Sequence, residues 1–107
     1  MKCQSAKEYR RVIADLRRSV PPLLPVYVRI AATEDAGGDC DLKEGVKIGP
    51  YFCIRLSKEL VGPSKIHVLI HEWAHCLSWS SAECGFEDHG PEWGLAMARC
   101  WVATLGE

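Results

Sequence analysis

The stretch that decides the fold is residues 63–79, PSKIHVLIHEWAHCLSW. Its apolar residues recur every three or four positions, which predicts an amphipathic helix. Gly62-Pro63 suits the start of that helix, because proline fits a first turn whose amide would be unpaired. At about 100° per residue, His71, Glu72 and His75 fall on one polar side. The opposite side is expected to face the core with Ile66, Leu69, Ile70, Trp73 and Leu77.

This helix contains an HExxH sequence, His71-Glu72-Trp73-Ala74-His75. Two imidazoles one helical turn apart can both reach an ion at about 2.0–2.1 Å, the length of a zinc–nitrogen bond. Glu72 flanks the same side, so its carboxylate can reach a water on the metal without binding the metal itself. The pattern predicts one Zn²⁺ ion held by His71 and His75, with Glu72 as the catalytic base.

A catalytic zinc site needs a third protein ligand and an open position for water. His89 is the preferred third ligand because it directly precedes Gly90-Pro91, a helix-start signal from which the chain can return over the HExxH helix. Glu92, on that following helix, is the alternative in an arrangement that uses a glutamate. The complete set of downstream candidates is Glu83, Cys84, Glu87, Asp88, His89 and Glu92.

The rest of the chain predicts helices and a small sheet. A capping-box pattern from Ser5 to Glu8 opens an apolar stripe that ends at Pro21-Pro22, which predicts an N-terminal helix. Alternating apolar residues predict strands at 26–32 and 51–57. Residues 33–50 are rich in glycine and aspartate and are interpreted as turns, with at most a short strand within Gly45–Ile48.

These elements predict one α+β domain over residues 1–107. It would consist of an N-terminal helix, a small and mostly antiparallel sheet, the HExxH helix and a C-terminal helix that begins at Gly90-Pro91. The strand at 51–57 has two interpretations: an edge at the rim of the site, to which an extended peptide could add, or an ordinary buried strand. Four residues are candidates to stabilise an oxyanion: Tyr9, Tyr27, Tyr51 and His67.

Composition and charge are those of an ordinary globular protein. The chain has 48% apolar and 25% charged residues and a net charge of −1. Residues 1–30 carry seven basic and two acidic side chains, so this segment could make a weak nucleic-acid contact or simply form a solvated helix face. None of the six cysteines is in a CxxC spacing, and neither a signal peptide nor a membrane-spanning run is visible. We therefore expect a cytoplasmic protein with reduced cysteines and no membrane contact.

Three motifs follow one another in the order seen in a known enzyme group: IRLSKEL at 54–60, LIHEWAHCLSW at 69–79 and DHGPEWG at 88–94. Over residues 45–101 the chain resembles the SprT-like and WLM metallopeptidases, which have a zincin-like fold. In that group an extended segment leads into the HExxH helix, and an HGxxW or HGxxF motif supplies the third ligand. The resemblance implies zinc on His71, His75 and His89, Glu72 as the base, and hydrolysis of peptide bonds in a protein or peptide substrate. No cysteine-rich zinc ribbon follows Trp101. We therefore expect the resemblance to hold for the active site and not for a DNA-linked role.

A non-enzymatic protein is the competing hypothesis. Zinc could stabilise a small domain that binds a protein partner, or that acts as an antirepressor-like regulatory factor. Glu72 discriminates between the two, since a purely structural zinc site has no use for a carboxylate beside the metal. The intact HExxH sequence favours the enzyme.

Overall fold

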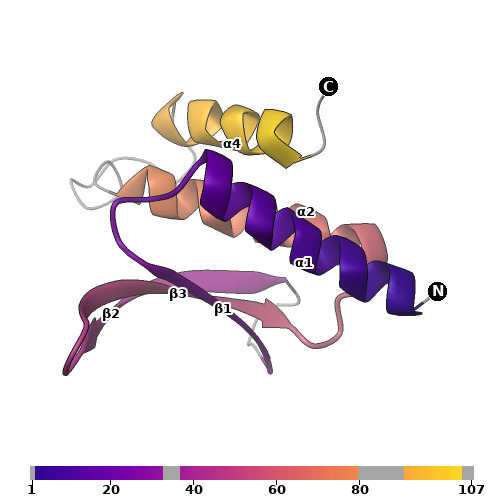
Figure 1. Ribbon diagram of the computed structural model, residues 1–107, viewed down its shortest axis with the longest axis horizontal. Helices are drawn as coiled ribbons and strands as arrows, with labels where there is room; N and C mark the ends of the chain where they lie inside the picture. The colour runs from indigo at the N-terminus through magenta and orange to yellow at the C-terminus, as the bar shows by residue number, and fades with distance from the viewer. Residues whose placement is uncertain (1, 33–36, 80–90, 105–107) are drawn as a thin grey trace.

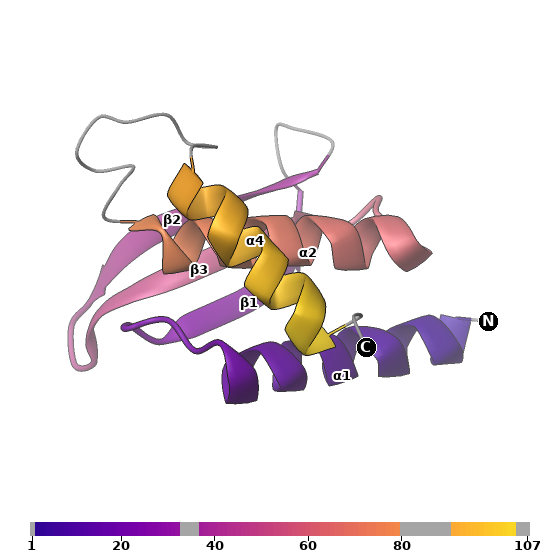
Figure 2. The same cartoon turned by 90° about the horizontal axis from the view of Figure 1, so that it is seen from above.

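The computed structural model describes residues 2–32, 37–79 and 91–104. Its helices lie on one side of a three-stranded sheet, with α1 and α2 nearest the sheet and α4 packed over both of them (Figures 1 and 2). In chain order the elements are α1 (Lys2–Ser19), β1 (Val26–Ala31), β2 (Gly38–Gly45), β3 (Gly49–Ser57), α2 (Gly62–Leu77) and α4 (Pro91–Thr104). The α+β class and the predicted order of the helices are thus confirmed.

The sheet has the strand order β1-β3-β2 and is mixed rather than mostly antiparallel. β3 pairs in parallel with β1, from Val26 opposite Phe52 to Ala31 opposite Ser57. On its other side β3 pairs antiparallel with β2. The segment predicted at 51–57 therefore forms the central strand, which excludes its interpretation as an edge. The edges are β1 and β2.

β2 corrects the prediction that residues 33–50 are mainly turns. Glycine and aspartate have low strand propensity, which concealed this strand, but its pairing with β3 outweighs that local preference. Residues 46–48, where a short strand was considered, form the turn that joins the two strands. Gly49 ends the turn at a φ of +81°, a backbone conformation that favours glycine.

α1 begins earlier than the capping box predicts. The helix starts at Lys2, so Ser5 lies inside it rather than at its N-cap. At the other end the Val20 amide donates to the Leu16 carbonyl at 2.9 Å. The Trp73 indole donates to the Val20 carbonyl, also at 2.9 Å, so a side chain of α2 satisfies the end of α1.

The core lies between the sheet and the two inner helices. β3 contributes Phe52, Ile54 and Leu56, which have exposed fractions of 4% or less. Val12 and Leu16 of α1 are fully buried against the same core. The predicted inner side of α2 is confirmed: Ile66, Leu69, Ile70 and Trp73 are buried and Leu77 is partly buried.

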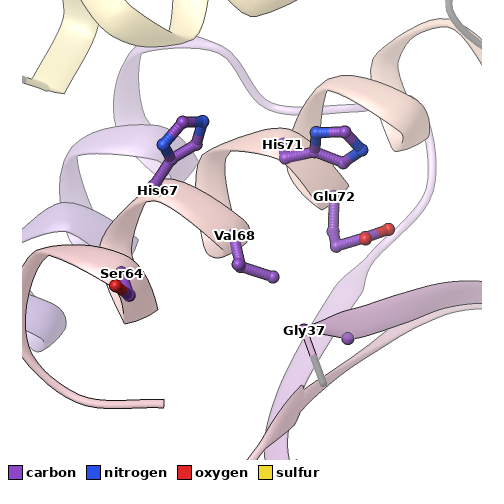
Figure 3. A pocket seen from close by; sticks show the side chains of 7 residues that line it. Gly37, Ser64, His67, Val68, His71 and Glu72 are labelled. Atoms are coloured by element: carbon purple, nitrogen blue, oxygen red, sulfur yellow. The ribbon is translucent and has the colours of Figure 1, made fainter. Parts of the chain in front are cut away.

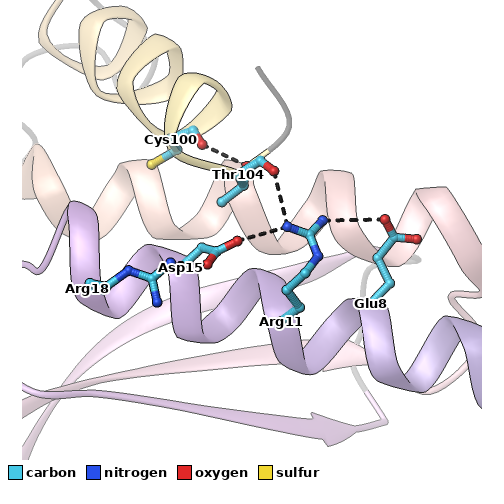
Figure 4. A network of polar contacts seen from close by, with 6 residues as sticks. All are labelled: Glu8, Arg11, Asp15, Arg18, Cys100 and Thr104. Carbon is cyan, nitrogen blue, oxygen red and sulfur yellow. Dashed lines mark hydrogen bonds and ion pairs between the residues drawn. The ribbon is translucent and has the colours of Figure 1, made fainter. Parts of the chain in front are cut away.

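A polar network joins α1 to α4 (Figure 4). It engages some of the arginine side chains of α1 in contacts within the chain. The Arg11 guanidinium donates to Asp15 at 2.8 Å and to the Thr104 carbonyl at 3.4 Å. Arg18 forms an ion pair with the same Asp15, and Arg17 donates to the Val26 carbonyl at 2.9 Å. These arginines therefore serve contacts within the chain. The predicted nucleic-acid contact stays a prediction.

Among the described helices, none combines the length and the apolar character that a bilayer crossing requires.

Candidate active site

The two histidines of the HExxH sequence converge on one point. Nε2 of His71 lies 3.3 Å from Nε2 of His75, and the ring centroids are 4.9 Å apart. An ion about 2.0–2.1 Å from both nitrogens, the zinc–nitrogen bond length, would see them at close to a tetrahedral angle. The pair therefore fits two ligands of a zinc ion.

All six candidates for the third ligand have their side chains outside the described part of the chain. Within residues 2–32, 37–79 and 91–104, no group of three His, Cys, Asp or Glu side chains has a metal-binding arrangement. His89, the preferred candidate, lies outside the described residues, as do the loop candidates Glu83, Cys84, Glu87 and Asp88. The Glu92 backbone belongs to α4, but its side chain is also outside them. His89 as third ligand stays a prediction.

Glu72 is a buried carboxylate beside this pair, with an exposed fraction of 8%. Its side chain points from α2 toward the sheet, where Gly37 leads into β2 (Figure 3). Burying a carboxylate is costly unless it interacts with other groups. A carboxylate held in such a place, next to converging imidazoles, is typical of a functional site.

A cleft of about 380 Å³ runs between α2 and the start of β2. Both His71 and Glu72 open onto it (Figure 3). Gly38 brings β2 close to its neighbours, because a Cβ there would lie 2.4 Å from the Arg55 carbonyl oxygen and 3.3 Å from Val68. The residues that line the cleft are Gly37, Gly38, Ser64, His67, Val68, His71 and Glu72.

Trp93 of α4 covers the two histidines. Its ring centroid lies 5.0 Å from that of His71 and 5.7 Å from that of His75. The indole Nε1 donates to the His71 carbonyl at 3.4 Å. The sequence identified Trp93 only as part of the HGPEWG motif. The signal for its role is its place in that motif, four residues after His89.

Of the four oxyanion candidates, His67 alone lines the cleft. Its exposed ring contacts Trp101 of α4, with the centroids 5.8 Å apart. Tyr27 and Tyr51 contact each other, at 5.3 Å, on strand positions that alternate with the core-facing ones. Tyr9, on α1, lies under the ammonium group of Lys65. The three tyrosines therefore do not line the cleft.

A thiol directly follows the second histidine. Cys76 is buried, and its Sγ lies 3.0 Å from Sγ of Cys40 in β2. The hydrogen bond to Cys40, and then burial, raise the pKa of Cys76 above the ordinary value of a thiol. Cys76 is therefore held as a neutral thiol. Burial likewise raises the pKa of Cys100, in α4, to about 12.

Comparison with known proteins identifies one family. The family model described as the SprT-like family matches residues 8–105, which include both converging histidines, Glu72, β2 and Trp93. No curated protein and no solved structure matches the chain. Because the family model spans nearly the whole sequence, the chain belongs to the SprT-like family.

Proposed function

We propose that this protein is a zinc-dependent metallopeptidase of the zincin type, formed by one domain over residues 1–107. The observation that carries the proposal is the 3.3 Å approach of the His71 and His75 Nε2 atoms beside the buried Glu72 carboxylate. His71, His75 and His89 would hold one Zn²⁺ ion. The family match supports a metallopeptidase-like domain.

Glu72 and His67, two polar side chains of the cleft, have tasks in the proposed reaction. The zinc ion, when bound, supplies Lewis acidity, which polarises a carbonyl and lowers the pKa of coordinated water. The Glu72 carboxylate accepts a proton from the attacking water and then passes it to the nitrogen of the departing amine. His67, one helical turn before His71 in the lining, would donate a hydrogen bond to the substrate carbonyl oxygen.

The substrate we infer is an extended segment of a protein. β2 is an edge strand, and its first residue, Gly38, lines the cleft together with Glu72. A peptide that adds to this edge by backbone hydrogen bonds would pass the reacting groups in an extended conformation. Such binding depends on backbone more than on side chains, so it suits a peptidase that accepts varied sequences.

The buried glutamate argues against a purely structural zinc site. Such a site is closed by four protein ligands and needs no further carboxylate. Glu72 instead opens onto a cleft large enough for a peptide group. A regulatory protease that cleaves one dedicated protein would have the same site, and it falls within the proposed function.

The decisive experiment compares Glu72→Gln with wild type for cleavage of unfolded casein and for zinc content. Loss of the base should lower kcat by roughly 100- to 10,000-fold while zinc stays bound. Glu59→Gln, which changes an exposed carboxylate away from the cleft, is the matched control and should cleave normally. Cleavage by Glu72→Gln at the wild-type rate would refute the role of this residue.

Two further variants assign the remaining groups. His89→Ala should lower the zinc content, and unchanged zinc would transfer the role of third ligand to another residue. His67→Gln should lower kcat and leave zinc binding unaltered. An unchanged kcat in His67→Gln would remove this residue from the reaction.

A further inference from the structure

Two cysteines meet across the interface between β2 and α2. The Sγ atoms of Cys40 and Cys76 are 3.0 Å apart, although 36 positions separate them in the sequence. Cys40 lies opposite Ile54 in the sheet register, and Ile54 is fully buried in the core. Cys40 therefore lies on the side of β2 that α2 covers, facing Cys76.

The separation of the sulfur atoms is close to that of a covalent link. A disulfide bond is about 2.05 Å long, so an approach of about 1 Å would join them. Such a shift is small for an edge strand, since β2 is held on one side only by its pairing with β3. The two side chains already face each other across this interface, as a disulfide requires.

The two thiols also differ in access to solvent. Cys40 is partly exposed, whereas Cys76 is buried with an exposed fraction of 4%. A small oxidant in solution therefore meets Cys40 first. Cys76 lies behind it as a thiol that can react with an oxidised Cys40.

We propose that Cys40 and Cys76 form an oxidation site at which a peroxide generates a reversible disulfide between β2 and α2. In the first step the Cys40 sulfur attacks hydrogen peroxide, becomes a sulfenic acid and releases water. In the second step the Cys76 sulfur attacks the Cys40 sulfur and the Cys76 thiol proton passes to the departing hydroxyl; the S–O bond breaks, the S–S bond forms and a second water leaves. Two electrons pass from the two thiols to the peroxide, and a dithiol reductant reverses the change.

The link would join the two walls of the cleft. β2 supplies Gly38 and α2 supplies Glu72 to the lining, and the new bond lies one residue beyond His75. It would therefore restrict how far β2 can move from the helix. This inference does not depend on peptide hydrolysis, because it concerns only the two thiols and the elements that carry them.

The test treats the purified protein with hydrogen peroxide, blocks the remaining thiols and maps the peptides without reduction. We expect a linked peptide pair that contains Cys40 and Cys76 and has lost the mass of two hydrogen atoms. Closing this loop should raise Tm by roughly 10 °C or more, and dithiothreitol should reverse the rise. Neither readout requires activity, so a failure here is distinct from a failure of the proposed peptidase.

Three variants make the test specific. Cys40→Ser and Cys76→Ala should both abolish the linked peptide and the rise in Tm. Cys100→Ala removes a fully buried thiol of α4 and should respond to peroxide like wild type. The proposal is overturned if peroxide produces no Cys40–Cys76 link, or if Cys40→Ser shows the same peroxide-dependent rise in Tm.

Discussion

The two sides of α2 differ in the parts of the molecule that they contact. The inner side consists of Ile66, Leu69, Ile70 and Trp73, all buried in the common core. The cleft side presents His67, His71, Glu72 and His75, whose neighbours are β2 and α4. The inner side therefore contributes mainly to the free energy of folding. The cleft side depends on residues that are distant in sequence for its geometry.

This difference predicts two separable classes of variant. Changes on the inner side should alter the unfolding free energy, whereas changes around the cleft side should alter zinc binding and turnover. Trp73 distinguishes the two classes most clearly. It lies directly between Glu72 and Ala74 of the HExxH sequence and yet is fully buried. It lies inside the HExxH sequence and belongs to the core.

The largest effect on stability is expected for Trp73→Ala. The change creates a cavity and removes the hydrogen bond to the Val20 carbonyl, so it should lower the unfolding free energy by about 3–5 kcal/mol. Urea unfolding followed by circular dichroism measures this loss. Trp73→Phe keeps most of the apolar volume and should lose about 1–2 kcal/mol while binding zinc normally. Normal stability with weakened zinc binding would assign Trp73 to the cleft side instead.

Much of the inner side was predictable because its signal is local. Apolar spacing within α2 was enough to identify the four buried residues, and the HExxH sequence was enough to place His71 and His75 together. The surroundings of the cleft were not predictable in the same way. β2 is hidden by its aspartate and glycine content, and its pairing partner β3 comes later in the chain. The HGPEWG motif singles out Trp93, but the motif alone does not indicate that its indole contacts His71.

Gly38→Ala tests the wall opposite α2. A Cβ at this position would lie 2.4 Å from the Arg55 carbonyl oxygen, so β2 or β3 would have to move. We expect a loss of about 2 kcal/mol in unfolding free energy, together with weaker substrate binding. Gly37→Ala is the matched control, because a Cβ there meets only the Val68 side chain at 3.7 Å. Equal losses in both variants would contradict the specific contact at Gly38.

The smallest of these effects, and the most direct test of the comparison, is expected for Trp93→Leu. The indole covers both imidazoles and donates to the His71 carbonyl, so its loss should leave the two rings less well oriented. Groups that orient metal ligands typically contribute about tenfold or more to metal affinity. Zinc affinity, measured by competition with a chelator, should fall by about that factor. The visible spectrum of the cobalt-substituted protein should change as well.

Trp101→Leu separates orientation from packing. Trp101 lies on the same helix and is also partly buried, but its ring contacts His67 of α2 rather than His71 or His75. Trp101→Leu should lower the unfolding free energy about as much as Trp93→Leu does. It should leave zinc affinity and the cobalt spectrum unchanged. If both variants weaken zinc binding equally, α4 acts only by packing on α2. If Trp93→Leu alone does so, the cleft side depends on one distant indole for the geometry of its two histidines.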